Sequence, residues 1–164
     1  MKRSAIWFLG FAFAIGIYLF QKYRIAPGLT PATIMIIDPE SGAEKPLSDL
    51  HEGILLVNFY ASWCGPCMKE MPSLQAGSEY AEEVQFIGLT DDPEEKIERV
   101  RSKFGIKFPL YKVVDKMGDQ GVHTYPTTYI FDGEKELLNY IGPRDWSEQD
   151  ILDQAAAGKN ISTY

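Results

Sequence analysis

Two cysteines, Cys64 and Cys67, stand two residues apart in this chain of 164 residues, and the sequence has no others. A secreted scaffold held together by disulfides needs more cysteines than this, and a closed zinc site usually needs four ligands. The pair therefore indicates redox chemistry of its own sulfur atoms. An inert buried pair and half of a zinc site are the structural alternatives.

The residues around the cysteines favour a reactive thiol. The segment Ile54–Tyr60 (ILLVNFY) is almost wholly apolar, which is typical of a strand buried on both faces of a sheet. After Cys64 the pattern predicts a helix to about Tyr80, with Pro72 as a kink inside it. Free N–H groups and the positive dipole end at the start of that helix should favour the thiolate form of Cys64 near neutral pH.

The rest of the chain alternates between apolar strands and helices. The helix after Thr90 should begin with Asp92 as its N-cap and end at Gly105. The other predicted elements are strands at Thr33–Ile37, Val84–Leu89, Leu110–Val114, Thr127–Phe131 and Leu137–Ile141 and a last helix from Asp145 to near Gly158. This order predicts an α/β fold, a central mixed β-sheet flanked by helices on both faces.

The charge balance excludes one class of partner. Lys and Arg number 16 against 23 Asp and Glu, a formal net charge of −7. Four of the basic residues lie in the first 24 positions, which hold no acid, so the remainder has 12 basic and 23 acidic residues. A domain this acidic repels phosphate backbones, so nucleic-acid binding is not expected.

The amino-terminal segment is apolar. Residues Ala5–Phe20 carry no charge and would span about 24 Å as a helix, slightly short of a hydrocarbon core of about 30 Å unless polar neighbours extend it. The segment predicts an uncleaved signal anchor, a transmembrane helix over residues 1–24, followed by a linker at 25–32 and a domain at 33–164. A cleaved signal peptide and a buried core helix are the alternatives.

The motif Trp63-Cys64-Gly65-Pro66-Cys67 after an apolar strand, with Pro72 and a later Tyr125-Pro126-Thr127, resembles the thioredoxin fold. More narrowly, the chain resembles the membrane-anchored TlpA/ResA-type thiol–disulfide oxidoreductases. Leu-Ser-Asp-Leu at 47–50, Val-Asn-Phe at 57–59 and the single apolar segment at the amino terminus carry this narrower resemblance, which covers about residues 33–157.

The resemblance implies a role for each matching residue. Cys64 would be the exposed nucleophile and Cys67 the resolving thiol of a redox disulfide. Pro126 would be a cis-proline that faces this disulfide. Trp63, Tyr125 and Pro126 would contact the substrate, with the backbone of Tyr125 pairing with an extended segment.

The resemblance also implies an acid–base residue. Ordinary thioredoxins have a buried Asp six residues before the first cysteine, where this chain has Asn58. TlpA/ResA-like proteins instead have an acid three residues after the second cysteine, and Glu70 matches that position. Residues i and i+3 share one face of a helix, so Glu70 would take the proton of Cys67, most effectively if it is partly buried with a raised pKa.

The expected function is that of a membrane-anchored disulfide reductase whose domain lies on the extracytoplasmic, periplasmic side. Its expected partners are disulfide-bearing proteins, with apocytochrome c as a candidate, and a membrane-embedded thiol donor of electrons. No cofactor and no metal are expected. A module that holds Cu(I) is the alternative, since Cys64, Cys67, Met68, Met71 and His123 offer soft or borderline ligands.

Overall fold

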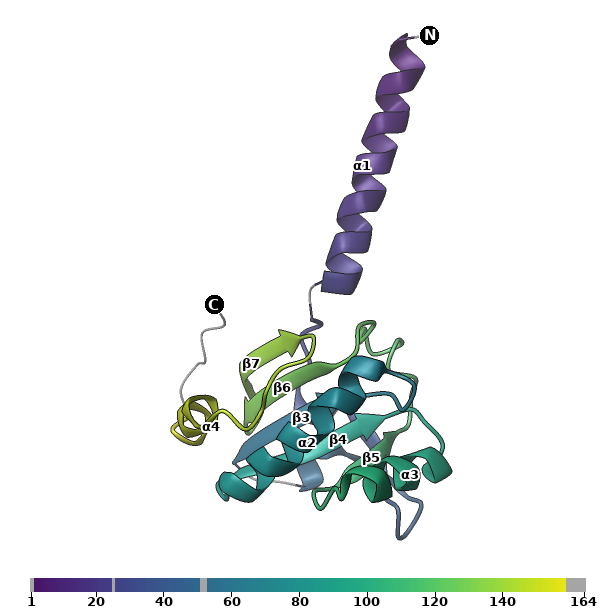
Figure 1. Cartoon of the computed structure of the whole chain (residues 1–164). Coiled ribbons are helices and arrows are strands. Elements are labelled where there is room, and N and C mark those ends of the chain that lie inside the picture. The colour runs from purple at the N-terminus through teal and green to yellow at the C-terminus, as the bar shows by residue number, and fades with distance from the viewer. Residues whose placement is uncertain (1, 25, 51–52, 159–164) are drawn as a thin grey trace.

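The computed structural model describes residues 2–24, 26–50 and 53–158, and within its first helix the side chains of residues 7–20. Its elements, in chain order, are α1 (Lys2–Arg24), η1 (Pro31–Thr33), β1 (Met35–Ile37), β2 (Glu44–Pro46), η2 (Leu47–Leu50), β3 (Ile54–Phe59), α2 (Gly65–Tyr80), β4 (Val84–Thr90), α3 (Glu94–Phe104), β5 (Leu110–Val113), β6 (Thr127–Asp132), β7 (Lys135–Ile141) and α4 (Gln149–Ala156). Figure 1 shows α1 extending from a layered α/β domain.

A mixed sheet of seven strands in the order β2-β1-β5-β4-β3-β6-β7 forms the centre of the domain, as predicted. Strands β3, β4 and β5 run parallel, whereas β6 pairs antiparallel with β3, and β7 with β6. All six residues of β3 are buried, which agrees with the apolar run that predicted a central strand. Strand β2 was not predicted, because its sequence Glu-Lys-Pro lacks an apolar or alternating pattern.

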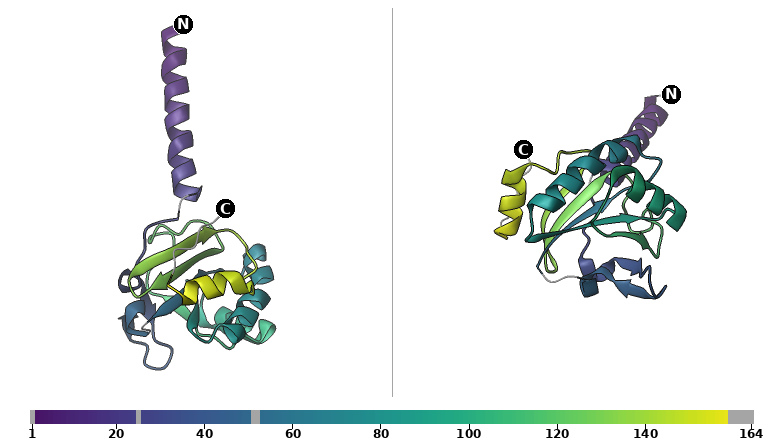
Figure 2. Two further views of the ribbon diagram at one scale, coloured as in Figure 1. Left: turned by 90° about the vertical axis from the view of Figure 1, so that its left-hand side faces the viewer. Right: turned by 60° about the horizontal axis from the view of Figure 1, so that its bottom comes forward.

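The helices do not cover both faces of the sheet, so that part of the prediction is wrong. Buried residues of α2, α3 and α4 all belong to one core cluster, on the face to which Leu56 and Ile130 point. The chain passes from β3 through α2 to β4 and on through α3 to β5, always in one direction along the sheet. Right-handed crossovers in one direction place both helices on the same face (Figures 1 and 2).

The other face of the sheet is covered by turns and loops. Its core cluster contains Leu55, Val57 and Phe59 of β3, and they alternate along the strand with residues that face the helices. The remaining buried members are Ile34, Ile36, Leu47, Ile87, Leu89, Val113, Met117, Val122, Tyr129 and Phe131. The sheet is therefore buried on both faces, although α-helices lie on only one and the 3-10 helix η2 contributes Leu47 to the other.

Two helices begin later than predicted. Helix α3 starts at Glu94 with Pro93 as its N-cap, and the carboxylate of Asp92 makes other contacts. Helix α4 starts at Gln149, because Asp145 uses its carboxylate to accept hydrogen bonds from the backbone N–H and hydroxyl of Ser147. The end of α3 is as predicted, with Gly105 in the left-handed region at φ 63°.

The amino-terminal segment forms a helix, but the prediction of a transmembrane span is not confirmed. In the part of the chain that the structure describes, no helix has the length and apolar character needed to cross a membrane.

The segment at residues 26–32, which the sequence predicts as linker, contacts the domain. The hydroxyl of Tyr129 donates to the carbonyl of Pro27 at 2.7 Å, and the N–H of Ala32 donates to Glu134 at 3.2 Å. Ala26 and Leu29 pack against the core cluster of the loop-covered face. These contacts fix this segment against the sheet below α1.

Candidate active site

The topology brings three distant segments to one edge of the sheet. In the strand register, Phe59 at the end of β3 lies beside Leu89 near the end of β4 and opposite Thr127 at the start of β6. The residues that follow β3 and β4 therefore meet the residues that precede β6. The first group includes Cys64 and Asp92, and the second includes Pro126.

Cys64 and Cys67 form a disulfide at the start of α2, with their Cα atoms 5.3 Å apart. Cys64 is the N-cap of this helix, and its sulfur accepts a hydrogen bond from the N–H of Cys67 at 3.2 Å. Only 5% of Cys64 and 1% of Cys67 is exposed. The nucleophile is therefore less accessible than the resemblance implies, since both cysteines belong to the core cluster beneath α2.

An aromatic pair lies beside the disulfide. Trp63 is 71% exposed, and its ring meets that of Tyr125 edge-on, with 5.7 Å between the ring centroids. Burial raises the pKa of the Tyr125 hydroxyl to about 12, so it stays protonated and donates to the carbonyl of Val122. The Tyr125–Pro126 peptide bond is cis, as the resemblance implies. Substrate contact by these residues remains a prediction.

Asp92 holds the loop that leads to the cysteines. Its buried carboxylate accepts hydrogen bonds from the backbone N–H of Ser62 at 2.6 Å and from the hydroxyl of Thr90 at 3.3 Å. Lys96, one turn into α3, pairs with the same carboxylate at 3.5 Å. The residue predicted as a helix cap therefore ties the end of β4 to the loop before Cys64.

Glu70, one turn after Cys67, is the most unusual acid of the site because only 3% of it is exposed. Its Oε1 atom accepts two hydrogen bonds of 2.8 Å, from the side-chain amide of Asn58 and from the indole N–H of Trp146. Its Oε2 atom accepts one longer bond of 3.3 Å from the backbone N–H of Arg144. The carboxyl group is thus held from three directions.

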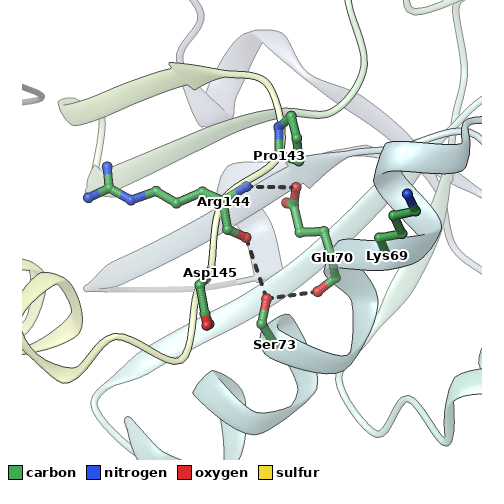
Figure 3. A pocket seen from close by; sticks show the side chains of 6 residues that line it. All are labelled: Lys69, Glu70, Ser73, Pro143, Arg144 and Asp145. Atoms are coloured by element: carbon green, nitrogen blue, oxygen red, sulfur yellow. Dashed lines mark hydrogen bonds between the residues drawn. The ribbon is translucent and has the colours of Figure 1, made fainter.

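Burial is the main influence on the charge of Glu70. It raises the pKa of this carboxyl from 4.5 to about 7, and the hydrogen bonds from Trp146, Arg144 and Asn58 offset only part of that effect. The Arg144 guanidinium lies over the rings of Tyr140 and Trp146, and in Figure 3 it points away from the carboxylate. Glu70 therefore changes protonation near neutral pH, as a general base requires.

A cavity of about 310 Å³ opens next to Glu70 (Figure 3). Its lining residues are Lys69, Glu70, Ser73, Pro143, Arg144 and Asp145. The hydroxyl of Ser73 donates to the Glu70 carbonyl at 2.9 Å and connects α2 to the loop that follows β7. The cavity gives a buried acid a route to solvent.

Sequence reasoning missed the residues that hold Glu70. Asn58 had a signal, because it is the one polar residue in an otherwise apolar strand, and its amide also donates to Thr128 at 2.9 Å. No local sequence signal pointed to Trp146, because the two residues that its indole bond joins are 76 positions apart in the chain. Gly77 leaves room for Trp146, because a Cβ atom at position 77 would lie 2.3 Å from the carbonyl oxygen of Trp146.

A disulfide-bonded cysteine pair at the start of a helix, in this mixed sheet and at the same end as a cis-proline, defines a thiol–disulfide oxidoreductase with a thioredoxin-like fold. The chain belongs to the AhpC/TSA family, whose sequence model matches residues 30–139. The resemblance on which the sequence analysis relied is thereby confirmed.

Relatives agree with this assignment. Thioredoxin-like protein YneN of Bacillus subtilis (strain 168) is 37% identical over 129 residues, 74% of this chain and 71% of that protein. Thiol-disulfide oxidoreductase ResA of Bacillus anthracis is 29% identical over 148 residues, 83% of this chain and 84% of ResA. A secreted disulfide oxidoreductase of Mycobacterium tuberculosis has the same fold, with a TM-score of 0.57, 20% identity and coverage of 77% of this chain and 96% of that one.

The Cu(I) alternative rests on cysteine and methionine ligands, and no observation tests it directly. Across the described ranges, no group of three or more His, Cys, Asp or Glu side chains is placed to hold a metal ion. Met71 is fully buried in the core cluster beneath α2, and the two cysteine sulfurs are bonded to each other. No observation favours metal binding over thiol exchange.

Replacement of Glu70 by Gln should remove a pH dependence of stability. Because its pKa rises from 4.5 to about 7 on folding, the folded state binds more protons than the unfolded state between these values. The free energy of unfolding should then fall by about 3 kcal/mol as the pH rises through that window, at about 1.36 kcal/mol per pKa unit. Urea unfolding of the oxidised protein between pH 4.5 and 8 measures this.

Glu79→Gln, near the other end of α2, is the matched control. The bond with Lys107 lowers the pKa of Glu79, so its contribution to stability is lost only as the pH falls below the window. The free energy of unfolding should fall with pH at the same slope in the wild-type chain and in Glu79→Gln. In Glu70→Gln this fall should be absent. Equal slopes in all three proteins would mean that Glu70 is not the group that titrates.

Proposed function

We propose that this oxidoreductase reduces disulfides in proteins outside the cytoplasm. The observation that carries the proposal is the cysteine pair at the start of α2 with a buried carboxyl one turn further along. The residues between the cysteines are Gly65 and Pro66, which resemble those of reducing members of the fold more than those of oxidising ones. The secreted relative in Mycobacterium tuberculosis supports the compartment.

The reaction moves two electrons from the cysteine pair to the substrate. The Cys64 thiolate attacks one sulfur of the substrate disulfide, so an intermolecular disulfide forms and one substrate thiolate leaves. The Cys67 thiolate then attacks the Cys64 sulfur, which forms the Cys64–Cys67 disulfide and releases the second substrate thiolate. The N–H of Cys67, which points at the Cys64 sulfur, would stabilise the negative charge there.

Glu70 would accept the proton that Cys67 loses before its attack. Cys67 lies in the core cluster, where a thiolate without an adjacent base is costly. Glu70 shares its helix face at the i+3 position. Trp63, Tyr125 and Pro126 would form the surface on which the substrate segment lies next to the disulfide.

A second protein must return electrons to the oxidised pair, because the reaction consumes the dithiol. A membrane-embedded thiol carrier is the donor that fits a domain outside the cytoplasm. The cysteine pair of apocytochrome c, which must be reduced before haem is attached, is a candidate substrate. The likeness to ResA supports protein thiols and disulfides as the class of substrate, and it does not single out apocytochrome c.

Helix α1 would anchor the chain to a membrane. Residues 7–20 of this helix, whose side chains the structure describes, are all exposed, and the large apolar ones include Trp7, Phe8, Phe11 and Phe13. Apolar side chains exposed all round a helix are costly in water and favourable in hydrocarbon. The extracytoplasmic side is the compartment in which the redox domain would then act.

Substitution of the two cysteines should have different consequences. Cys67→Ser keeps the nucleophile but lacks the resolving thiol, so it should accumulate mixed disulfides with substrate proteins. Cys64→Ser should form none and should lose reductase activity. Capture of adducts under non-reducing electrophoresis, and turbidity from insulin reduction, measure the two effects. Adducts with Cys64→Ser alone would reverse the assignment.

The reduction potential tests the proposed direction of electron flow. The Cys64–Cys67 couple should have a potential near that of thioredoxin, about −270 mV, because a reductase must lose electrons readily. Equilibration with glutathione buffers measures it. A value near −120 mV, that of a strong oxidant, would assign the oxidising direction instead.

Glu70→Gln should slow the release of substrate from the mixed disulfide. The wild-type rate should rise with pH to a plateau above about pH 7, where Glu70 is ionised and accepts the proton. The variant should be slower by about 10²-fold at pH 7.5 and lack this rise. Single-turnover rates between pH 5.5 and 8.5 test this, with Glu79→Gln as control. Profiles that superimpose would remove Glu70 from the mechanism.

Charges placed on α1 should release the chain from lipid. The double substitution Phe11→Asp/Ile15→Asp should shift the full chain from vesicles to the soluble fraction, whereas Phe11→Leu/Ile15→Leu should stay bound. Flotation with phosphatidylcholine vesicles measures the bound fraction. Equal flotation of the two variants would argue against an anchor in α1.

A further inference from the structure

A groove lies between the start of α2 and α3, next to the cysteines. It has a volume of about 180 Å³ and is lined by Ser62, Met68, Lys96, Arg99, Val100 and Lys103, which we call the α3 groove. Ser62 precedes Cys64 by two residues, and Met68 directly follows Cys67. In Figure 1 α2 and α3 lie on the same side of the sheet. A protein whose disulfide reaches Cys64 must therefore pass close to this groove.

The groove is basic in a chain that is acidic overall. Three of its six lining residues are cations and none is an acid, although the chain carries a net charge of −7. Lys96, Arg99 and Lys103 follow one another at intervals of three and four, which places them on one face of α3. This local positive charge would attract a negatively charged partner, which the acidic remainder of the protein's surface would repel.

Two of these cations are available to a ligand. Arg99 pairs with Glu95, but both side chains are largely exposed, so the ion pair contributes little and can rearrange. Lys103 lies over the ring of Phe104 at 5.0 Å and has no carboxylate partner among the described residues. Lys96 differs from them, because it is bound to the buried carboxylate of Asp92.

The floor of the groove is apolar. Val100 is buried, and Met68 packs against the core cluster beneath α2. The volume is smaller than the roughly 300–1,000 Å³ of pockets that enclose a whole small molecule. A site of this size, with an apolar floor and a cationic rim, matches a side chain of a polypeptide with carboxylates beside it.

We propose that the α3 groove docks an acidic segment of the substrate protein next to the disulfide that Cys64 attacks. This inference rests on the proposed function and names the chemistry of its partner. The cations would raise the rate of encounter and fix the direction in which the substrate chain crosses the site. They would act on binding and not on the exchange of the sulfur atoms.

The test uses two disulfide peptides that differ only in the residues around the cysteine pair, Asp and Glu in one and Asn and Gln in the other. The full chain in neutral detergent should reduce the acidic peptide with a kcat/KM about tenfold higher, which corresponds to about 1.4 kcal/mol. The difference should lie in KM and shrink as salt is raised. Arg99→Glu/Lys103→Glu should abolish the preference and leave the neutral peptide within twofold.

Lys107→Glu/Lys135→Glu is the matched control, because it changes the net charge equally. Lys107 contacts the carboxyl-terminal half of α2. Lys135 lies opposite Asp132 in the register of β6 and β7, at the other end of β6 from Pro126. This variant should keep the preference. If it loses the preference as well, or if the wild-type chain reduces both peptides equally, the groove has no docking role.

Two further results separate this inference from the proposed function. Failure to reduce even the neutral peptide would contradict the reductase function, whereas reduction without preference would contradict only the groove. Glutathione disulfide, a small anion that also carries carboxylates, is the competing occupant. If Arg99→Glu/Lys103→Glu slows its reduction tenfold but affects both peptides equally, the groove binds a small disulfide and the peptide proposal is wrong.

Discussion

The buried carboxylate of Glu70 connects most of the parts that make up the active site. Asn58 reaches it from β3, Trp146 and Arg144 reach it from the loop before α4, and the residue itself lies on the helix that begins at the cysteines. A buried acid is tolerated because donors surround it and because it can take up a proton near neutral pH. The loop after β7 is thereby fixed against α2.

The same arrangement explains why Asn58 and Glu70 belong together. Asn58 lies on the face of β3 that points toward α2, as Leu56 does, and its amide bridges Glu70 and Thr128. An amide can donate to both but cannot exchange a proton at neutral pH. In the proposed reaction the acid–base function would therefore rest on the helix, while the strand supplies a fixed donor.

Local sequence patterns predicted much of this fold, and the failures involve contacts between distant segments. The apolar run of β3, the helix after Cys64 and the two strands on either side of Asp132 depend on neighbouring residues, and each was predicted. The side of the sheet on which α3 lies depends on the direction of successive crossovers, which no local pattern reports. Asp92 and Trp146 likewise act through partners far along the chain, Ser62 and Glu70.

The two oxygens of Glu70 are not equivalent. Oε1 faces two groups, the Asn58 amide and the Trp146 indole, that can only donate, so it has to remain an acceptor in either charge state. An added hydrogen must therefore reside on Oε2, the atom that accepts the longer bond from the backbone N–H of Arg144 (Figure 3). In the proposed reaction Glu70 would therefore gain and lose its proton on Oε2, while the indole of Trp146 stays bound to Oε1.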